Sequence, residues 1–308
     1  MAKRTLVSFD WAIKRLLRQK ANFDILEGFL TELIGEDIVI LHLLESESNK
    51  ENEDDKFNRV DLMCENDRKE LIIIEVQYYA EIDYFQRMLF GTSKVITEYM
   101  KEGDAYDKVR KVYSVNILYF DLGQGKDYVY RGKMEFSGIH MEDELLLSAH
   151  QQQIFNKTVP AELFPEYFII KVNNFDDVAK NSLDEWIYYL KNTELPERFK
   201  ARGLKKVEER LMYDKMDTTT RQQYDQYLKD VKISKSMIDT AKLEGKLEGK
   251  LEGKLEGKLE GKLEGKLEGK IEIILSSYDA GLSVDLISTI TRISEAEVTR
   301  ILREDGKV

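Results

Sequence analysis

Apolar positions change their spacing along the chain, and each change marks a new element. From Phe9 to Ile34 they recur every three or four residues, which is the period of an amphipathic helix. The pattern falls into two pieces and stops at Gly35, so we expect two helical segments that end there. The short apolar run Ile38–Leu44 predicts a strand, and the acidic stretch Glu45–Lys56 predicts an exposed loop.

Two strand-like runs follow this loop. Phe57–Cys64 largely alternates between apolar and polar residues, whereas Glu70–Gln77 is more continuously apolar. The polar segment 65–69 between them suits a hairpin turn. Because a continuously apolar strand is typical of a position covered on both faces, we expect the second run in the centre of a sheet.

The remaining elements of the first region alternate between the two periods. A helix is expected over Ile82–Lys101, with Gly103 as its stop, and another through Trp186 before Pro196. Strands are expected at Lys111–Asp121, Tyr128–Phe136 and Tyr167–Val172. The pattern therefore predicts an α/β domain over residues 1–195.

The second half of the chain has a different composition. Residues 196–241 form a charged segment of helical character, and Lys-Leu-Glu-Gly then repeats seven times from Lys242 to Gly269. The tail 271–308 contains two short amphipathic pieces that resemble a small helix-turn-helix.

The repeat, assigned to residues 242–270, lacks the features of a coiled coil. A helix turns by about 400° over four residues, so its leucine row drifts by about 40° per repeat and keeps no fixed face. Each glycine costs roughly 1 kcal/mol in a helix interior, and identical charges recur at i,i+4. A loosely helical or flexible linker is favoured over a coiled coil.

Composition narrows the class of protein. Hydrophobic residues make up 42% of the 308 residues and charged residues 34%, which excludes a wholly disordered chain. No apolar run approaches the roughly 18 residues of a membrane span, and the basic start lacks a secretory pattern. Cys64 is the single cysteine, so it cannot form an intramolecular disulfide. We expect a cytoplasmic protein with no membrane partner.

Charge is distributed unevenly. The net charge of −11 disfavours binding to phosphate backbones, but the first 20 residues carry six basic residues against the one acid Asp10. Two acids, Asp61 and Glu75, interrupt apolar runs on the two consecutive predicted strands. Their burial would be costly without compensation, and a divalent cation that prefers oxygen ligands, Mg²⁺ or Mn²⁺, would supply it. Exposed charges at strand ends are the alternative.

These residues carry a resemblance to a known family. Arg59–Leu62 followed by Ile72–Gln77 resembles the pattern of the recombination-promoting nuclease/transposase family, within the PD-(D/E)XK nuclease superfamily. Phe9–Lys14, Phe85–Met88 and Tyr167–Lys171 agree in order and spacing. The resemblance implies an α/β, restriction-endonuclease-like PD-(D/E)XK core with a mixed central sheet flanked by helices. A helical C-terminal extension would follow this core.

The resemblance also implies roles for individual residues. Asp61 and Glu75 would be catalytic metal ligands for Mg²⁺ or Mn²⁺, together with the backbone carbonyl of Val76. Gln77 stands at the catalytic position where the wider superfamily has lysine. Glutamine can orient a water molecule but brings no positive charge.

Further residues are implied as DNA contacts. Arg87, Lys94 and Lys14 would be these contacts, and either lysine could stand in for the missing catalytic one. A solvated helix face is the alternative for Arg87 and Lys94. Asp10 could be an additional acid near the metal or an N-cap.

The resemblance implies one function, to which there is an alternative. It implies a magnesium-dependent endonuclease that hydrolyses phosphodiester bonds of DNA with low sequence specificity and promotes DNA recombination. The alternative is a catalytically inactive nuclease fold that serves as a DNA-binding or interaction module. An RNA substrate and assembly with a second copy of the chain also stay open.

Overall fold

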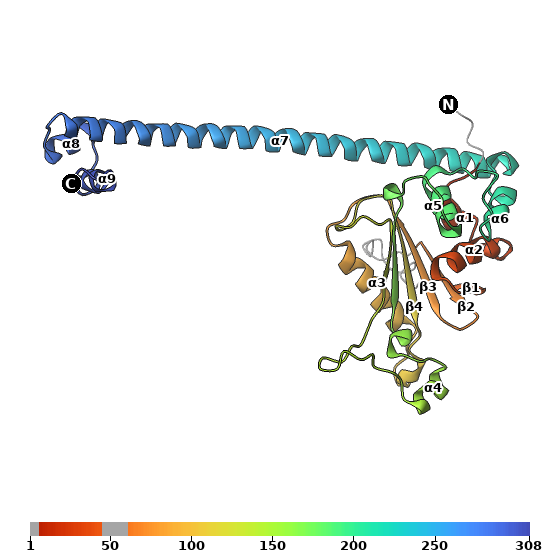
Figure 1. The fold of residues 1–308 in the computed structure, drawn as a ribbon. Coiled ribbons are helices and arrows are strands. Elements are labelled where there is room, and N and C mark those ends of the chain that lie inside the picture. Colours follow the sequence, from red (N-terminus) through yellow and green to blue (C-terminus); the bar gives the residue numbers. More distant parts are fainter. Residues whose placement is uncertain (1–5, 45–60) are drawn as a thin grey trace. The chain divides into compact units, whose positions relative to one another are not determined.

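The computed structural model describes residues 6–44 and 61–308. The predicted loop Glu45–Lys56, and the predicted strand up to residue 60, lie outside these described residues. The chain divides into two compact units, Met1–Tyr227 and Leu228–Val308 (Figure 1). Among the described residues, none of the helices has the length and apolar character that a membrane span needs.

The first unit is built on a six-stranded sheet in the order β1-β2-β3-β4-β6-β5. β1, β2 and β3 pair antiparallel, β3, β4 and β6 pair parallel, and β5 runs antiparallel to β6. This mixed sheet confirms the predicted α/β class, and β3 occupies the expected interior position. The strands are β1 (Ile40–Leu44), β2 (Leu62–Asn66), β3 (Leu71–Gln77), β4 (Val112–Leu118), β5 (Val129–Gly132) and β6 (Glu166–Lys171).

Helices flank this sheet (Figure 1). The predicted break in the first helical stretch is present, and Gly35 takes the left-handed conformation with φ 81° at its end. The helices are α1 (Phe9–Arg15), α2 (Phe23–Ile34), α3 (Tyr84–Glu98), α4 (Ala149–Phe155), α5 (Ser182–Asn192) and α6 (Leu204–Arg210). Short 3₁₀ turns are η1 (Lys20–Asn22), η3 (Tyr106–Lys108), η4 (Pro160–Leu163), η5 (Val172–Asn174) and η6 (Tyr213–Lys215).

The first compact unit continues beyond the predicted boundary at residue 195. The backbone N–H of Val7 donates to the carbonyl of Leu211 at 3.0 Å, and that of Ser8 donates to the Tyr224 hydroxyl at 3.0 Å. Tyr224 is buried and packs edge-on against Trp11 with ring centroids 5.0 Å apart. Residues up to Tyr227 therefore complete the core that holds α1 in place.

The second unit contains most of α7 (Thr218–Asp279), then α8 (Val284–Thr291) and α9 (Glu295–Glu304). The whole Lys-Leu-Glu-Gly repeat is helical in this structure, because it lies inside α7. Its leucines are 56–61% exposed. The predicted short helices of the tail are present, and they pack on the end of α7 through Ile274, Ile287, Val298, Ile301 and Leu302.

Candidate active site

The β2–β3 hairpin brings the two acids of the sequence motif together. Leu62 pairs with Ile74 in an antiparallel register, so Asp61 and Glu75 occupy the next pair of positions along the two chains. The backbone N–H of Val76 donates to Asp61 Oδ2 at 2.7 Å, which fixes the Asp61 carboxylate at the edge of β3. The register, which the sequence alone left open, therefore places the two acids opposite each other across the β2–β3 hairpin.

Both carboxylates are largely withdrawn from water. The side chains of Asp61 and Glu75 are 18% and 14% exposed, so they are not exposed strand-end charges. Burial raises the pKa of Glu75 to about 7; the nearby Arg87 opposes this shift and the Asp61 charge adds to it. Two neighbouring carboxylates that repel each other in a poorly solvated place are a site where a cation would be stabilised.

Basic groups from the first helical stretch lie beside Asp61. Lys14, in α1, places Nζ 3.1 Å from Asp61 Oδ1. Arg18, just after α1, donates from Nη2 to the backbone carbonyl of Asp61 at 2.8 Å. The structure thus brings the predicted Lys14 to the acids and adds Arg18, which sequence reasoning counted only as part of the basic start.

Tyr84 of α3 contacts Glu75, and Asn116 of β4 is the register partner of Glu75 in the sheet. Tyr84, the first residue of α3, is fully buried, and its hydroxyl lies 3.4 Å from Glu75 Oε2 and 3.1 Å from Asn116 Oδ1. The sequence pattern does not single out Tyr84, so its contact with Glu75 was not predicted. Asn116 and Ser114 are buried polar residues inside the otherwise apolar strand β4, and a search for polar residues that interrupt apolar runs could have found them.

Gln77 and Arg87 meet at a residue that the motif does not include. Gln77, at the end of β3, donates from Nε2 to Glu81 Oε1 at 2.6 Å. Arg87 of α3 donates from Nη1 to Oε1 and Oε2 of Glu81 at 2.7 and 2.9 Å. Arg87 Nε also lies 3.8 Å from Glu75 Oε2. Glu81 therefore links the catalytic-position glutamine to the arginine beside the acids.

Two further predicted site residues, Lys94 and Asp10, have other immediate partners. Lys94 lies seven residues after Arg87 on α3, and its ion pair is with Glu98 at 3.8 Å. Asp10 is buried in the first turn of α1, where Ser8 is the N-cap, and burial raises its pKa despite nearby Ser8 and Tyr78. Within residues 6–44 and 61–308, no three His, Cys, Asp or Glu side chains gather closely enough to hold a metal ion.

The donor set fits a hard divalent cation held by few protein ligands. Asp61 and Glu75 offer carboxylate oxygens, and Mg²⁺ is commonly bound by one or two carboxylates plus water and substrate phosphate. Lys14 now neutralises Asp61 in part, so a cation would compete with it for that carboxylate. The arrangement is a two-carboxylate site, not a three-acid one.

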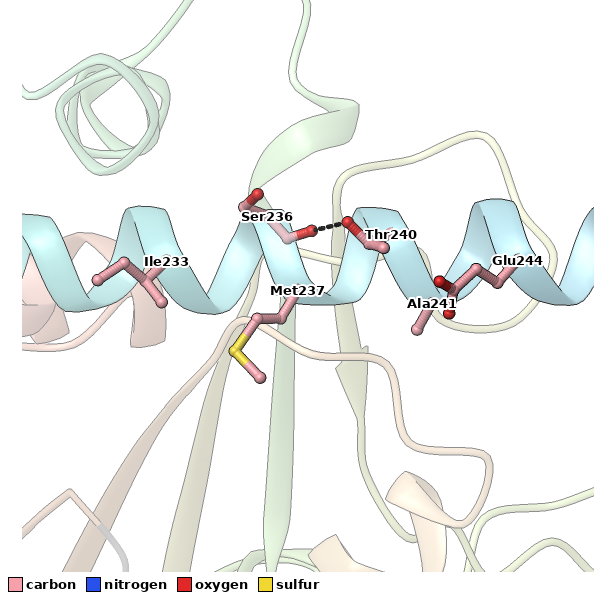
Figure 2. A pocket seen from close by; sticks show the side chains of 6 residues that line it. All are labelled: Ile233, Ser236, Met237, Thr240, Ala241 and Glu244. Carbon is pink, nitrogen blue, oxygen red and sulfur yellow. Dashed lines mark hydrogen bonds between the residues drawn. The ribbon is translucent and has the colours of Figure 1, made fainter.

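A separate hollow on α7 is not lined by a pair of carboxylates. It is lined by Ile233, Ser236, Met237, Thr240, Ala241 and Glu244 (Figure 2). All six residues come from the one helix, and the hydrogen bond drawn there is Thr240 Oγ1 donating to the Ser236 carbonyl at 2.8 Å. Ile233 and Met237 are more than half exposed. The hollow is a groove between side chains of a single helix.

Comparison with known proteins identifies the family that this chain resembles. A family model described as PD-(D/E)XK nuclease family transposase matches residues 7–241, which include every element that carries a site residue. No curated protein and no solved structure matches the chain.

Proposed function

This chain belongs to the family of PD-(D/E)XK nuclease family transposases, and from this membership we propose that it is a metal-dependent DNA endonuclease. The observation that carries the proposal is the pairing of Asp61 with Glu75 at the end of the β2–β3 hairpin, where Val76 donates to Asp61 at 2.7 Å. Mg²⁺ or Mn²⁺ would be held by Asp61, Glu75 and the backbone carbonyl of Val76.

The cation and the side chains have separate tasks in this proposal. When bound, a divalent cation would stabilise charge on the scissile phosphate and lower the pKa of a neighbouring water. Arg87, close to Glu75, would hold a phosphate oxygen with its guanidinium group. Lys14, displaced from Asp61 by the cation, would supply a second positive charge to the backbone of the nucleic acid.

The proposed substrate is DNA, cut with low sequence specificity. The basic groups near the acids are Lys14, Arg18 and Arg87, whose positive charges favour contact with phosphates. Contacts to phosphate position a nucleic acid but do not report its sequence. Strand breaks made in this way would promote recombination.

A non-catalytic module with the same fold is the second candidate, because Gln77 replaces the superfamily lysine. Titration of Mn²⁺ into the metal-free protein, followed by calorimetry, separates the two. We expect binding by the wild type and by Asp67→Ala, whose exposed acid lies in the turn at the far end of β2. Asp61→Ala should lose the signal.

Absence of Mn²⁺ binding by the wild-type protein would favour the non-catalytic module. Equal binding by the wild type and Asp61→Ala would place the cation elsewhere and would contradict the proposed site.

A further inference from the structure

Glu81 lies in the turn between β3 and α3, and two site residues hold it. Arg87 Nη1 contacts both of its carboxylate oxygens, at 2.7 and 2.9 Å. Gln77 Nε2 donates to the Oε1 atom of the same carboxylate at 2.6 Å. The side chain of Glu81 is 31% exposed, so these bonds form in a partly desolvated place. Glu81 is thus an acceptor shared by the two groups.

The partner of Gln77 decides which way its amide faces. An amide nitrogen donates hydrogen bonds and an amide oxygen accepts them, whereas an ionised carboxylate only accepts. A reversed amide would place the Gln77 oxygen against a Glu81 oxygen and would lose a charge-assisted hydrogen bond. The amide nitrogen of Gln77 therefore donates to Glu81. The Gln77 Oε1 atom has no protein hydrogen-bond partner among the residues that the structure describes.

We propose that Glu81 is a positioning residue for Gln77, which it orients so that Oε1 accepts a hydrogen bond from the attacking water. This inference rests on the proposed nuclease function. Gln77 then acts with a polarity opposite to that of the superfamily lysine, because a lysine ammonium donates and Oε1 accepts. A water that donates a hydrogen bond to Gln77 Oε1 keeps a lone pair available for attack on the phosphorus atom.

A purely structural role for Glu81 predicts a different pattern of variants. If Glu81 only anchored Arg87, the loss of its charge would be the damaging change, and Glu81→Gln would be as harmful as Glu81→Ala. If Glu81 orients Gln77, Glu81→Gln retains an oxygen at the position of Oε1 that can still accept from Nε2. The conservative variant therefore distinguishes orientation of the amide from anchoring of the arginine.

The contact itself can be tested without activity. In metal-free, ¹⁵N-labelled protein, the side-chain amide signal of Gln77 is identified by its loss in Gln77→Ala. We expect this signal to shift in Glu81→Ala and to stay in place in Glu102→Ala, which removes an exposed acid beyond α3. An unchanged Gln77 signal in Glu81→Ala would overturn the proposal, whatever the activity.

A double-mutant cycle in a DNA-cleavage assay then tests the consequence. Glu81→Ala should slow cleavage about tenfold in the wild-type background, the effect of one lost oriented hydrogen bond. It should slow cleavage less than twofold in Gln77→Ala, because the group that it positions is absent. Glu81→Gln should retain most of the rate. Equal losses in both backgrounds would overturn the proposal.

The two proposals fail in distinguishable ways. A wild-type protein that binds Mn²⁺ without cutting DNA would contradict the nuclease function and, with it, the role of Gln77 toward water. The amide signal would still decide whether Glu81 orients Gln77.

Discussion

The steric surroundings of glycine differ between the two units of this protein. Gly28, in α2, lies against the 202–203 backbone, and a Cβ atom added there would stand 2.4 Å from the carbonyl oxygen of Arg202. A Cβ added at any glycine of the repeat, such as Gly257, would meet nothing within 4 Å. Packing dictates the residue in the first case. In the second, the fold places no steric demand on it.

The two units also differ in how their charged side chains are paired. Around the acids of the first unit, Lys14 pairs with Asp61 and Arg87 pairs with Glu81. Within the repeat, whose residues the structure describes in full, no lysine and glutamate form an ion pair, because like charges recur at i,i+4. Tertiary contacts therefore stabilise the α/β unit, whereas the exposed leucines and open glycines of the repeat leave its helix to local propensity.

The largest effect is expected when all seven repeat glycines are changed to alanine. Each change favours the helix by about 1 kcal/mol, so together they favour it by about 7 kcal/mol. Hydrogen exchange should show at least tenfold slower exchange of the amides in residues 242–270. Slow exchange already present in the wild-type repeat would contradict the comparison, since it would show that contacts stabilise this helix.

Gly28→Ala should destabilise the protein, whereas the repeat substitutions should stabilise their helix. The added methyl group collides with the Arg202 backbone, and we expect a loss of about 3 kcal/mol in the free energy of unfolding of the first unit. Urea unfolding followed by tryptophan fluorescence measures it, because Trp11 and Trp186 both lie in this unit. Gly91→Ala, in open space on α3, is the matched control and should not destabilise the unit.

The buried Glu75 should give the first unit a pH dependence of similar or smaller size. Its pKa is about 7 in the folded protein and about 4.5 in the unfolded chain, so the folded state binds more protons between these values. This contribution to stability is fully present below pH 4.5 and is lost as pH rises through 7, by about 3 kcal/mol.

Urea unfolding of the metal-free protein at a series of pH values measures this dependence. Glu75→Gln should remove that component of the pH dependence. The same slope in the wild type and the variant would show that another group is responsible.

The smallest effect is expected from deletion of two repeats. Because the repeat leucines are exposed and the repeat glycines meet nothing within 4 Å, the stability of the first unit should change by less than about 0.5 kcal/mol. DNA cleavage should change less than twofold. A larger loss of either quantity would show that the length of α7 matters to the α/β unit.

The sequence predicted those features that depend on local pattern. The continuous apolar run of β3 indicated its interior position, and the break between α1 and α2 followed from the spacing of apolar residues. The fold as a whole followed from the family resemblance. α4 was not predicted because none of its residues is buried, so it leaves no apolar period to detect.

The residue types of the site could be predicted from the sequence, but their arrangement in space could not. Asp61 and Glu75 interrupt apolar runs, but their register depends on where the hairpin turns, and β2 extends to Asn66 before a turn that contains Lys69 at φ 61°. Glu81 is one acid in a short loop, and only the folded turn shows that it meets Gln77 and Arg87. Such contacts depend on tertiary placement, which spacing does not encode.

Asp61 and Glu75 are proposed here as the working centre of a nuclease. The most direct test is nicking of supercoiled plasmid by the purified chain in Mg²⁺ or Mn²⁺, beside Asp61→Ala and Glu75→Ala. The account predicts metal-dependent nicking by the wild type that both variants lose, with tryptophan fluorescence showing that they remain folded. Equal nicking by all three proteins, or none by any of them while all still bind the plasmid, would contradict it.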